Sequence, residues 1–403
     1  MNQNRGLLRV KHGHGHHRVT FVELFFDLVF VFAVTQLSHS LLEHFSTLGA
    51  VQTTLLTFAV WWTWMYTTWW TNWLDPDRLP VRVALLMLML PGLILSASIP
   101  YAFETRGLAF AGAYVLMHCG RAGFFLWAAR GHQRMTRNFQ GILAWVVAAS
   151  IFWLAGAFAH DAQRLLLWTV ALGIDLAAPW AGYWIPVLGR STTTDWDVEG
   201  GHMSERCALF IIIALGESLL VTGATFAGMP WTAETMPALI VSFLGSVAMW
   251  WLYFDTSAEV GTRAIADSRD PGRIARLVYT YIHLLLVGGV ILSAVGDEFV
   301  LAHPLGHTEW PTAIAVVGGP LLFVLGTWLF KWAIYGRPPF SPLVAIVVLG
   351  SLLAAAPVVP PVVLMAMATV VLIGSAMWEA RTAASCPVPA PSVATHSQPS
   401  QPI

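Results

Sequence analysis

The sequence predicts an all-α integral membrane protein of about twelve transmembrane helices, arranged as two parallel six-helix repeats with both termini in the cytoplasm. Three observations lead to this fold class: the composition, a regular succession of apolar runs, and the placement of basic residues between those runs. Hydrophobic residues make up 57% of the 403 residues and charged residues only 11%, far from the balance of soluble domains. A water-soluble fold is therefore excluded.

The apolar runs have the length that a membrane requires, because a helix needs about twenty residues to cross the hydrocarbon core. The last two runs are separated by Pro357, Pro360 and Pro361, and they form either two spans or a re-entrant pair; both arrangements leave the C-terminus on the same side. The twelve expected helices cover residues 21–42, 54–74, 81–99, 107–129, 140–159, 165–188, 205–226, 236–256, 276–296, 312–334, 341–357 and 360–379.

The basic residues orient these helices. With the N-terminus inside, all but three of the 21 lysines and arginines fall at cytoplasmic ends and loops; Arg106 and Arg164 lie in outer loops and Arg121 lies within a helix. Such a bias, alternating loop by loop, follows the positive-inside rule. We expect a multi-pass membrane protein, in which the outer loop 297–311 is acidic and His-rich.

Five segments follow from this arrangement. They are a basic, His-rich cytoplasmic N-terminus (1–20), a first six-helix repeat (21–188), a cytoplasmic linker (189–204), a second six-helix repeat (205–379) and a disordered cytoplasmic tail rich in Ser, Pro, Ala and Gln (380–403). The first apolar run carries charged residues and lacks a small-residue cleavage site, so it is not a signal peptide.

The two repeats are related by four matches in the same order. Residues 33–36 fall on 214–217, Trp61-Trp62 near Trp250-Trp251, 94–97 on 291–294, and 125–128 near 330–333. Because six helices return the chain to the same side, the repeats share one orientation, as in parallel-repeat transporters. A pathway is expected where the repeats meet.

Several classes of function lack support in the composition. The formal net charge is −1, so no global field recruits nucleic acid. The three cysteines, Cys119, Cys207 and Cys386, are too widely spaced for a disulfide framework or a paired metal site, and we interpret them as small hydrophobic residues. No nucleotide-binding loop, voltage-sensor pattern or potassium filter sequence is present.

Four stretches resemble the bacterial low temperature requirement A (LtrA) family. They are Glu23-Leu-Phe-Phe-Asp27-Leu-Val-Phe-Val-Phe-Ala33; residues 71–78; His202-Met-Ser-Glu205-Arg206 with Ala214-Leu-Gly-Glu217-Ser218; and Tyr281-Ile-His283. Positions 207 and 208 read Cys-Ala where the family pattern leads us to expect an aromatic residue and a glycine. The resemblance implies a multi-pass membrane protein linked by name to growth in the cold, and no mechanism. Phe25-Phe-Asp27 is also similar to the Phe-Ser-Asp start of lysosomal-type potassium channels.

Charged residues inside apolar helices mark the candidate site, because a charge in mid-membrane needs a partner or water. Glu23 and Asp27 share one face of the first helix and form either a cation-attracting mouth or an anchoring cluster. Glu217, deep in the seventh helix, is the leading candidate to carry a proton or bind a cation, with a structural hydrogen bond as the alternative. Its expected counterpart is Gln36, and the remaining transport-path candidates are Glu205, Arg206 and His283.

Other polar residues have structural interpretations. Arg121 and Asp175 are expected to form a neutralising buried ion pair. His283 either relays protons or is a packing histidine. The cluster His12, His14, His16 and His17 lacks support for a metal, and the six tryptophans between Trp61 and Trp73 supply an aromatic belt and lipid-facing or packing bulk.

The sequence therefore favours a transporter or channel for a cation or proton along helices one and seven. A non-transporting membrane protein needed for growth in the cold is the second hypothesis, and an intramembrane acid/base enzyme is the third. We expect no catalytic residues, no metal and no cofactor. The bilayer is the expected surrounding, with an inorganic cation or a proton as the candidate ligand, no nucleic acid as partner, and a homodimer left open.

Overall fold

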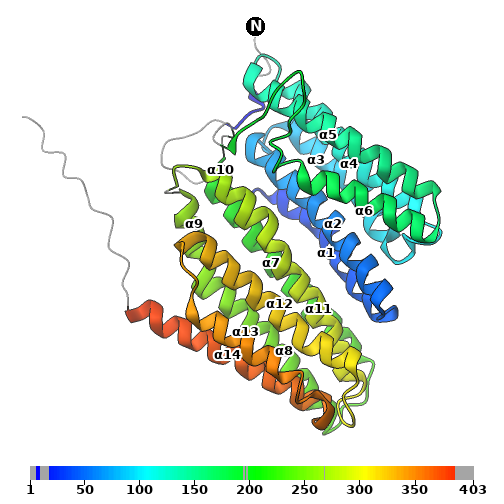
Figure 1. Cartoon of the computed structure of the whole chain (residues 1–403), viewed down its shortest axis with the longest axis vertical. Helices are drawn as coiled ribbons and strands as arrows, with labels where there is room; N and C mark the ends of the chain where they lie inside the picture. Colours follow the sequence, from blue (N-terminus) through cyan, green and yellow to red (C-terminus); the bar gives the residue numbers. More distant parts are fainter. Residues whose placement is uncertain (1–5, 10–17, 194–195, 197, 267, 386–403) are drawn as a thin grey trace, which may run out of the picture.

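A computed structural model describes residues 6–9, 18–193, 196, 198–266 and 268–385. All the regular elements in these ranges are helices, so the predicted all-α fold is confirmed (Figure 1). The predicted His12 to His17 cluster and most of the predicted tail lie outside the described residues.

The first half of the chain folds into six helices. Helix α1 packs on α2 and α3, α2 also contacts α4 and α6, and further contacts run in sequence from α3 to α4, α5 and α6. The helices are α1 (Phe21–Glu43), α2 (Thr47–Trp73), α3 (Leu79–Ser98) with a 3₁₀ turn η2 (Ile99–Tyr101), α4 (Gly107–Ala128), α5 (Gln133–Phe158) and α6 (Asp161–Ala177).

The second half packs α7 on α8 and α11, and then runs from α11 to α12, α13 and α14. Two π-helical segments interrupt it, η4 at the end of α8 and η5 before α11. The elements are α7 (Gly200–Ala227), α8 (Thr235–Tyr253), η4 (Phe254–Ala258), α9 (Glu259–Ala266), α10 (Pro271–Ile274), η5 (Ala275–Ile282), α11 (His283–Ala302), α12 (Trp310–Tyr335), α13 (Phe340–Leu352), η6 (Ala356–Val358) and α14 (Pro361–Ser385).

Helices α1 and α2 of the first half meet α7, η5 and α11 of the second half (Figure 1). Two indole groups of α2 fasten this contact at one residue of η5. Trp61 donates through Nε1 to the Thr280 carbonyl oxygen at 2.7 Å, and Trp69 donates to Thr280 Oγ1 at 3.0 Å. The contact between the halves is therefore polar as well as apolar.

Nine of the described helical segments are long and apolar enough to cross a membrane: α1, α3, α4, α5, α7, α8, α10 to α11, α12 and α14. Of the other three predicted spans, α2 has 27 residues but many Trp and Thr, α6 has 17 residues, and α13 has 13. These apolar helices and their number confirm a multi-pass membrane protein.

The α13 region still crosses the bundle, although the helix itself is short. It starts beside the end of α12, and by Val359 the chain has returned to the level where α12 begins. There Thr308 donates to the Val359 carbonyl oxygen at 2.6 Å and Val362 N donates to the Pro304 carbonyl oxygen at 3.1 Å. Residues 340–359 therefore make a crossing that a turn and the short η6 complete, rather than half of a re-entrant pair.

Several predicted boundaries were wrong, and at α7 and α11 the reason is that buried polar residues belong to the helix. Helix α7 begins at Gly200, where the Glu199 carboxylate caps the His202 N–H at 2.6 Å, so its first residues replace the end of the predicted linker. Helix α11 continues to Ala302, which places Asp297 inside a helix instead of the predicted outer loop. Helix α6 ends at Ala177, and α14 continues to Ser385.

Candidate functional site

Two fully buried charged side chains form an ion pair between the two halves. Arg206 Nη2 of α7 lies 2.9 Å from Asp27 Oδ1 of α1, and both side chains are fully buried. Trp64 of α2 donates to the same oxygen at 2.7 Å, and the Arg206 guanidinium lies over its ring. Asp27 Oδ2 and the Arg206 Nε and Nη1 atoms have no hydrogen-bond partner in the described part of the chain.

A second polar contact joins the same two helices one turn away. His202 of α7 contacts the Glu23 carboxylate of α1 at 2.8 Å, and Arg9 lies 3.6 Å from the same carboxylate. Glu23 also accepts the Thr20 N–H at 2.9 Å, which caps the start of α1. Asn72 at the end of α2 contacts the His202 ring at 3.2 Å. Three helices and the N-terminal segment are therefore joined at one end of the bundle.

The Arg9 side chain is drawn into this junction from outside the helices. Its Nε donates to the carbonyl oxygens of Thr71 at 2.7 Å and Leu74 at 3.2 Å, at the end of α2. Burial lowers the pKa of Arg9, and the neighbouring Glu23 carboxylate opposes that shift. Arg9 remains charged at neutral pH, so it offsets the charge of the Glu23 carboxylate.

A third contact lies further along the same helix pair. The Thr35 hydroxyl of α1 donates to the Glu217 carboxylate of α7, and both side chains are partly buried. The predicted partner Gln36 is next to Thr35, but no hydrogen bond among the described residues joins it to Glu217. The side of α1 that faces Glu217 carries Thr35 rather than Gln36. An alignment of the two halves in sequence cannot reveal which residue faces the other helix.

Two other transport-path candidates, Glu205 and His283, take no part in these three contacts between α1 and α7. The Glu205 carboxylate accepts the Val19 N–H at 3.0 Å and so fixes the segment that leads into α1. His283 is fully buried at the start of α11, where Nδ1 contacts the Val278 carbonyl oxygen and Nε2 contacts the Tyr253 hydroxyl, both at 2.9 Å. Since the carbonyl can only accept, the neutral ring carries its proton on Nδ1 and accepts from Tyr253. Both ring nitrogens are therefore occupied.

The predicted ion pair of Arg121 and Asp175 was wrong. Asp175 accepts from the Tyr114 hydroxyl at 2.7 Å and from Trp153 Nε1 at 3.1 Å. Arg121 donates to the carbonyl oxygens of Met117 and Thr63 and to the Thr67 hydroxyl. Neutral groups thus bond each residue separately, although Arg121 Nη2 keeps no partner among the described residues, and no ion pair of the described residues involves Arg121 or Asp175.

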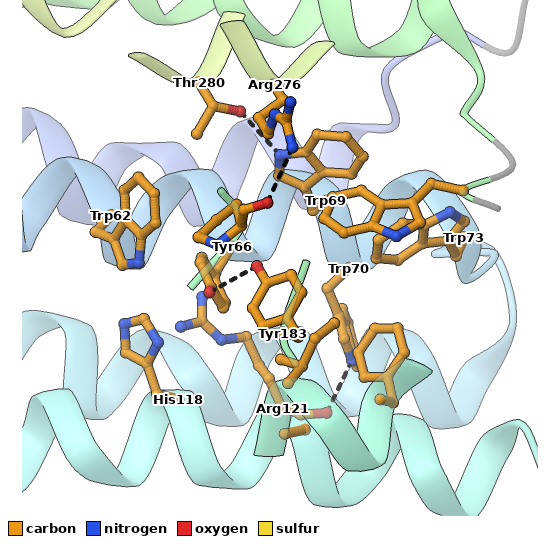
Figure 2. Close-up of a pocket in the computed structure, with 15 residues that line it drawn as sticks. Trp62, Tyr66, Trp69, Trp70, Trp73, His118, Arg121, Tyr183, Arg276 and Thr280 are labelled. Carbon is orange, nitrogen blue, oxygen red and sulfur yellow. Dashed lines mark hydrogen bonds between the residues drawn. The ribbon is translucent and has the colours of Figure 1, made fainter. Parts of the chain in front are cut away.

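An aromatic pocket lies beside Arg121, and Figure 2 shows its walls. About 570 Å³ of empty space, which includes space open to the surroundings, lies between α2, α4, α5, η5 and the residues Pro179, Tyr183 and Trp196. The aromatic lining consists of Trp62, Tyr66, Trp69, Trp70, Trp73, Phe139, Tyr183 and Trp196, and the polar lining consists of His118, Arg121, Arg276 and Thr280.

The sequence contained a signal for this pocket that we interpreted as packing. Trp62, Tyr66, Trp69 and Trp73 recur at helical spacing and so share one face of α2. The tryptophans at 61, 62, 64, 69 and 70 are all buried, so the lipid-facing alternative was wrong for them. The partners Tyr183, Trp196 and Arg276 are distant in the sequence and carry no pattern that links them to α2.

Comparisons with known proteins agree with the sequence resemblance. The family model described as bacterial low temperature requirement A protein (LtrA) matches residues 18–377. An uncharacterized protein of Rhizobium meliloti (strain 1021) is 40% identical over 364 residues, which cover 90% of this chain and 89% of that protein. No solved structure matches the chain.

Proposed function

Because the chain belongs to the bacterial low temperature requirement A (LtrA) family, whose name states no mechanism, we propose its function from the contact between α1 and α7. The proposal is that a cation or a proton crosses the bacterial inner membrane along this contact, through a transporter or channel built from two parallel six-helix repeats. The chain has no catalytic role in this proposal.

The helix contacts support the repeats. In the first half α1 contacts α2 and α3, and successive contacts join α3, α4, α5 and α6; in the second half α7 contacts α8 and α11, and successive contacts join α11, α12, α13 and α14. Residues 23, 27 and 35 of α1 contact residues 202, 206 and 217 of α7, so the residue numbers rise in the same order along both helices. Helices α1 and α7 therefore run in the same direction, as parallel repeats require.

The basic residues support the orientation. Arg9 bonds to the end of α2, and Arg137 at the start of α5 bonds to the Leu188 carbonyl oxygen. Arg164, one of the two arginines assigned to outer loops, bonds instead to the carbonyl oxygens of Ala102 and Glu104, in the turn between α3 and α4. Under the positive-inside rule, the basic end that contains the starts of α1, α5 and α7 faces the cytoplasm.

The observation that carries the proposal is the depth of the three polar contacts. From Glu23 to Thr35 the helix rises about 18 Å at 1.5 Å per residue, which is more than half of a hydrocarbon core of about 30 Å. All three contacts join the same two helices, one from each half. Polar groups are expensive at this depth unless they face one another or a path for water or ions.

The central pair also has unused bonding capacity. Among the described residues, one oxygen of Asp27 and two nitrogens of Arg206 lack hydrogen-bond partners, although buried charged groups normally have them. A water, a proton or a cation beside Asp27 would use the free oxygen. Because the pair joins the two halves, a movement of α1 against α7 changes this contact.

The test is ion flux through the full-length protein in proteoliposomes, measured separately for potassium, sodium and protons. Glu217→Gln keeps the size of the side chain and removes its charge. Glu234→Gln is the matched control, because Glu234 is an exposed acid of the same half, outside this contact.

We expect flux of at least one ion in the native protein, a loss of about tenfold or more in Glu217→Gln, and native flux in the control. Folded native protein that passes none of the three ions would refute the proposal. Equal flux in Glu217→Gln and Glu234→Gln would show that the path does not run past Glu217 of α7.

A further inference from the structure

The aromatic pocket beside α2 contains buried donors with nothing to bind. Arg121 Nη2, Trp62 Nε1 and Arg276 Nε are buried and have no hydrogen-bond partner in the described part of the chain, and all three side chains line this one pocket. Arg121 is only 3% exposed. Buried donors without acceptors are rare and costly, so the pocket lacks acceptors that a ligand could bring.

The charge of the pocket has the same imbalance. Two guanidinium groups line it, and no carboxylate is among its lining residues. Arg276 donates to the Pro179 carbonyl oxygen at 2.9 Å and lies over the Trp180 ring, and Arg121 bonds only to uncharged oxygens. A buried cation without a countercharge is unfavourable. An anionic group on a ligand would supply both the charge and the missing acceptors.

His118 provides a further polar atom on the same wall. The Thr63 hydroxyl donates to the Ala59 carbonyl oxygen at 2.9 Å, so it accepts from His118 Nε2 at 3.2 Å. The neutral ring then leaves Nδ1 as an acceptor, and this atom is also buried without a partner. The arrangement accommodates an anion beside Arg121 together with one hydrogen-bond donor of a ligand or a water.

The rest of the lining selects the shape of the ligand body. Figure 2 shows tryptophan and tyrosine rings on several sides of the space between Arg121 and Arg276. Flat apolar groups pack well against such rings, in offset or edge-to-face geometry. A long flexible chain would leave these flat walls poorly filled, whereas one or two fused rings would present flat faces to them.

One wall of the pocket is held in a strained conformation. Tyr183 has a φ of 46°, in the left-handed region that residues with side chains seldom adopt. Its hydroxyl lies 3.0 Å from the Tyr66 hydroxyl, so Tyr183 is held against α2. Strain of this kind persists where the surrounding structure requires it, and it often lies at binding sites.

We infer that this pocket binds a small organic anion with a flat apolar body, such as an aromatic carboxylate, with its anionic group at Arg121 and Arg276. The inference does not depend on ion transport between α1 and α7, because none of the residues that carry it belongs to that contact.

The test uses 2-naphthoate as the probe, with 2-naphthalenemethanol as its neutral counterpart and palmitate as a flexible anion. Binding to the full-length protein in nanodiscs is measured by isothermal titration calorimetry. Arg276→Gln removes one guanidinium. Arg106→Gln is the matched control, because Arg106 also lies over an aromatic ring and donates to a backbone carbonyl oxygen, but far from the pocket.

We expect naphthoate to bind at least tenfold more tightly than the alcohol and more tightly than palmitate. Arg276→Gln should weaken naphthoate binding at least fivefold and Arg106→Gln should not. Arg121→Gln should weaken it further, provided that the variant elutes as folded protein. Equal binding of the anion and the alcohol, tighter binding of palmitate, or equal effects of the Arg276 and Arg106 substitutions would each overturn the inference.

Discussion

The buried pair of Asp27 and Arg206 offers a direct test of how charge holds the two halves together. Arg206→Met leaves the Asp27 carboxylate without its cation, and Asp27→Asn leaves the Arg206 guanidinium without its anion. The double variant removes both charges and keeps an acceptor for Trp64 Nε1, which lies 2.7 Å from Asp27 Oδ1. The three variants form a double-mutant cycle.

The expected magnitude follows from the geometry. The pair is fully buried with its atoms 2.9 Å apart, and removal of one partner of such a pair costs about 3 to 5 kcal/mol. Trp64 still bonds Asp27, and its ring still faces Arg206, so each single variant should lie near the lower figure, about 3 kcal/mol. That figure corresponds to roughly a hundredfold in the folding equilibrium.

The double variant should cost less than the sum of the singles, with a coupling energy of about 2 to 3 kcal/mol. The assay is unfolding of the purified protein by titration with sodium dodecyl sulfate, followed by circular dichroism. Single variants within about 0.5 kcal/mol of the native protein, or strictly additive costs, would show that the two groups do not stabilise each other and would refute this account.

Two further pairs of substitutions, each a test with its control, probe the packing by the same unfolding assay. Gly319→Ala should destabilise the protein by about 1 to 3 kcal/mol, because the new methyl group would lie 2.6 Å from the Ser293 backbone nitrogen, whereas Gly374→Ala meets no atom within 4 Å and should be neutral. Trp61→Phe should cost about 1 to 3 kcal/mol by leaving the Thr280 carbonyl oxygen without the Trp61 donor, whereas the half-exposed Trp250→Phe should change little. Equal stability within either pair would contradict the contact concerned.

The fold class could be predicted from the sequence because the bilayer imposes one simple rule on length and apolarity. Every predicted run corresponds to a helical segment. The boundaries were less accurate where polar residues enter a helix, as at His202 and Asp297, because hydropathy ends a helix where burial in the protein continues it.

The candidate site was predicted in part. The sequence placed Glu23 and Asp27 on one face of the first helix, and in the structure both bond to residues of α7. The pairing of Asp27 with Arg206 was not predicted. The assignment of Arg121 to Asp175 was wrong because it counted only charges. A hydroxyl and an indole N–H bond Asp175, and a hydroxyl and backbone carbonyls bond Arg121. Sequence position does not reveal such neutral partners.

The pocket and the contact between the halves share helix α2. One face of this helix carries Trp64, which bonds Asp27; another carries the pocket residues Trp62 and Tyr66. The pocket lining also includes Thr280 of the second half, which accepts from Trp69. Residues of both halves form the walls of the pocket. A displacement that separates α2 from η5 would therefore break the hydrogen bonds from the two indole groups to Thr280 and open the pocket at the same time. A molecule bound there would contact both halves at once, so its affinity must depend on how the halves are arranged.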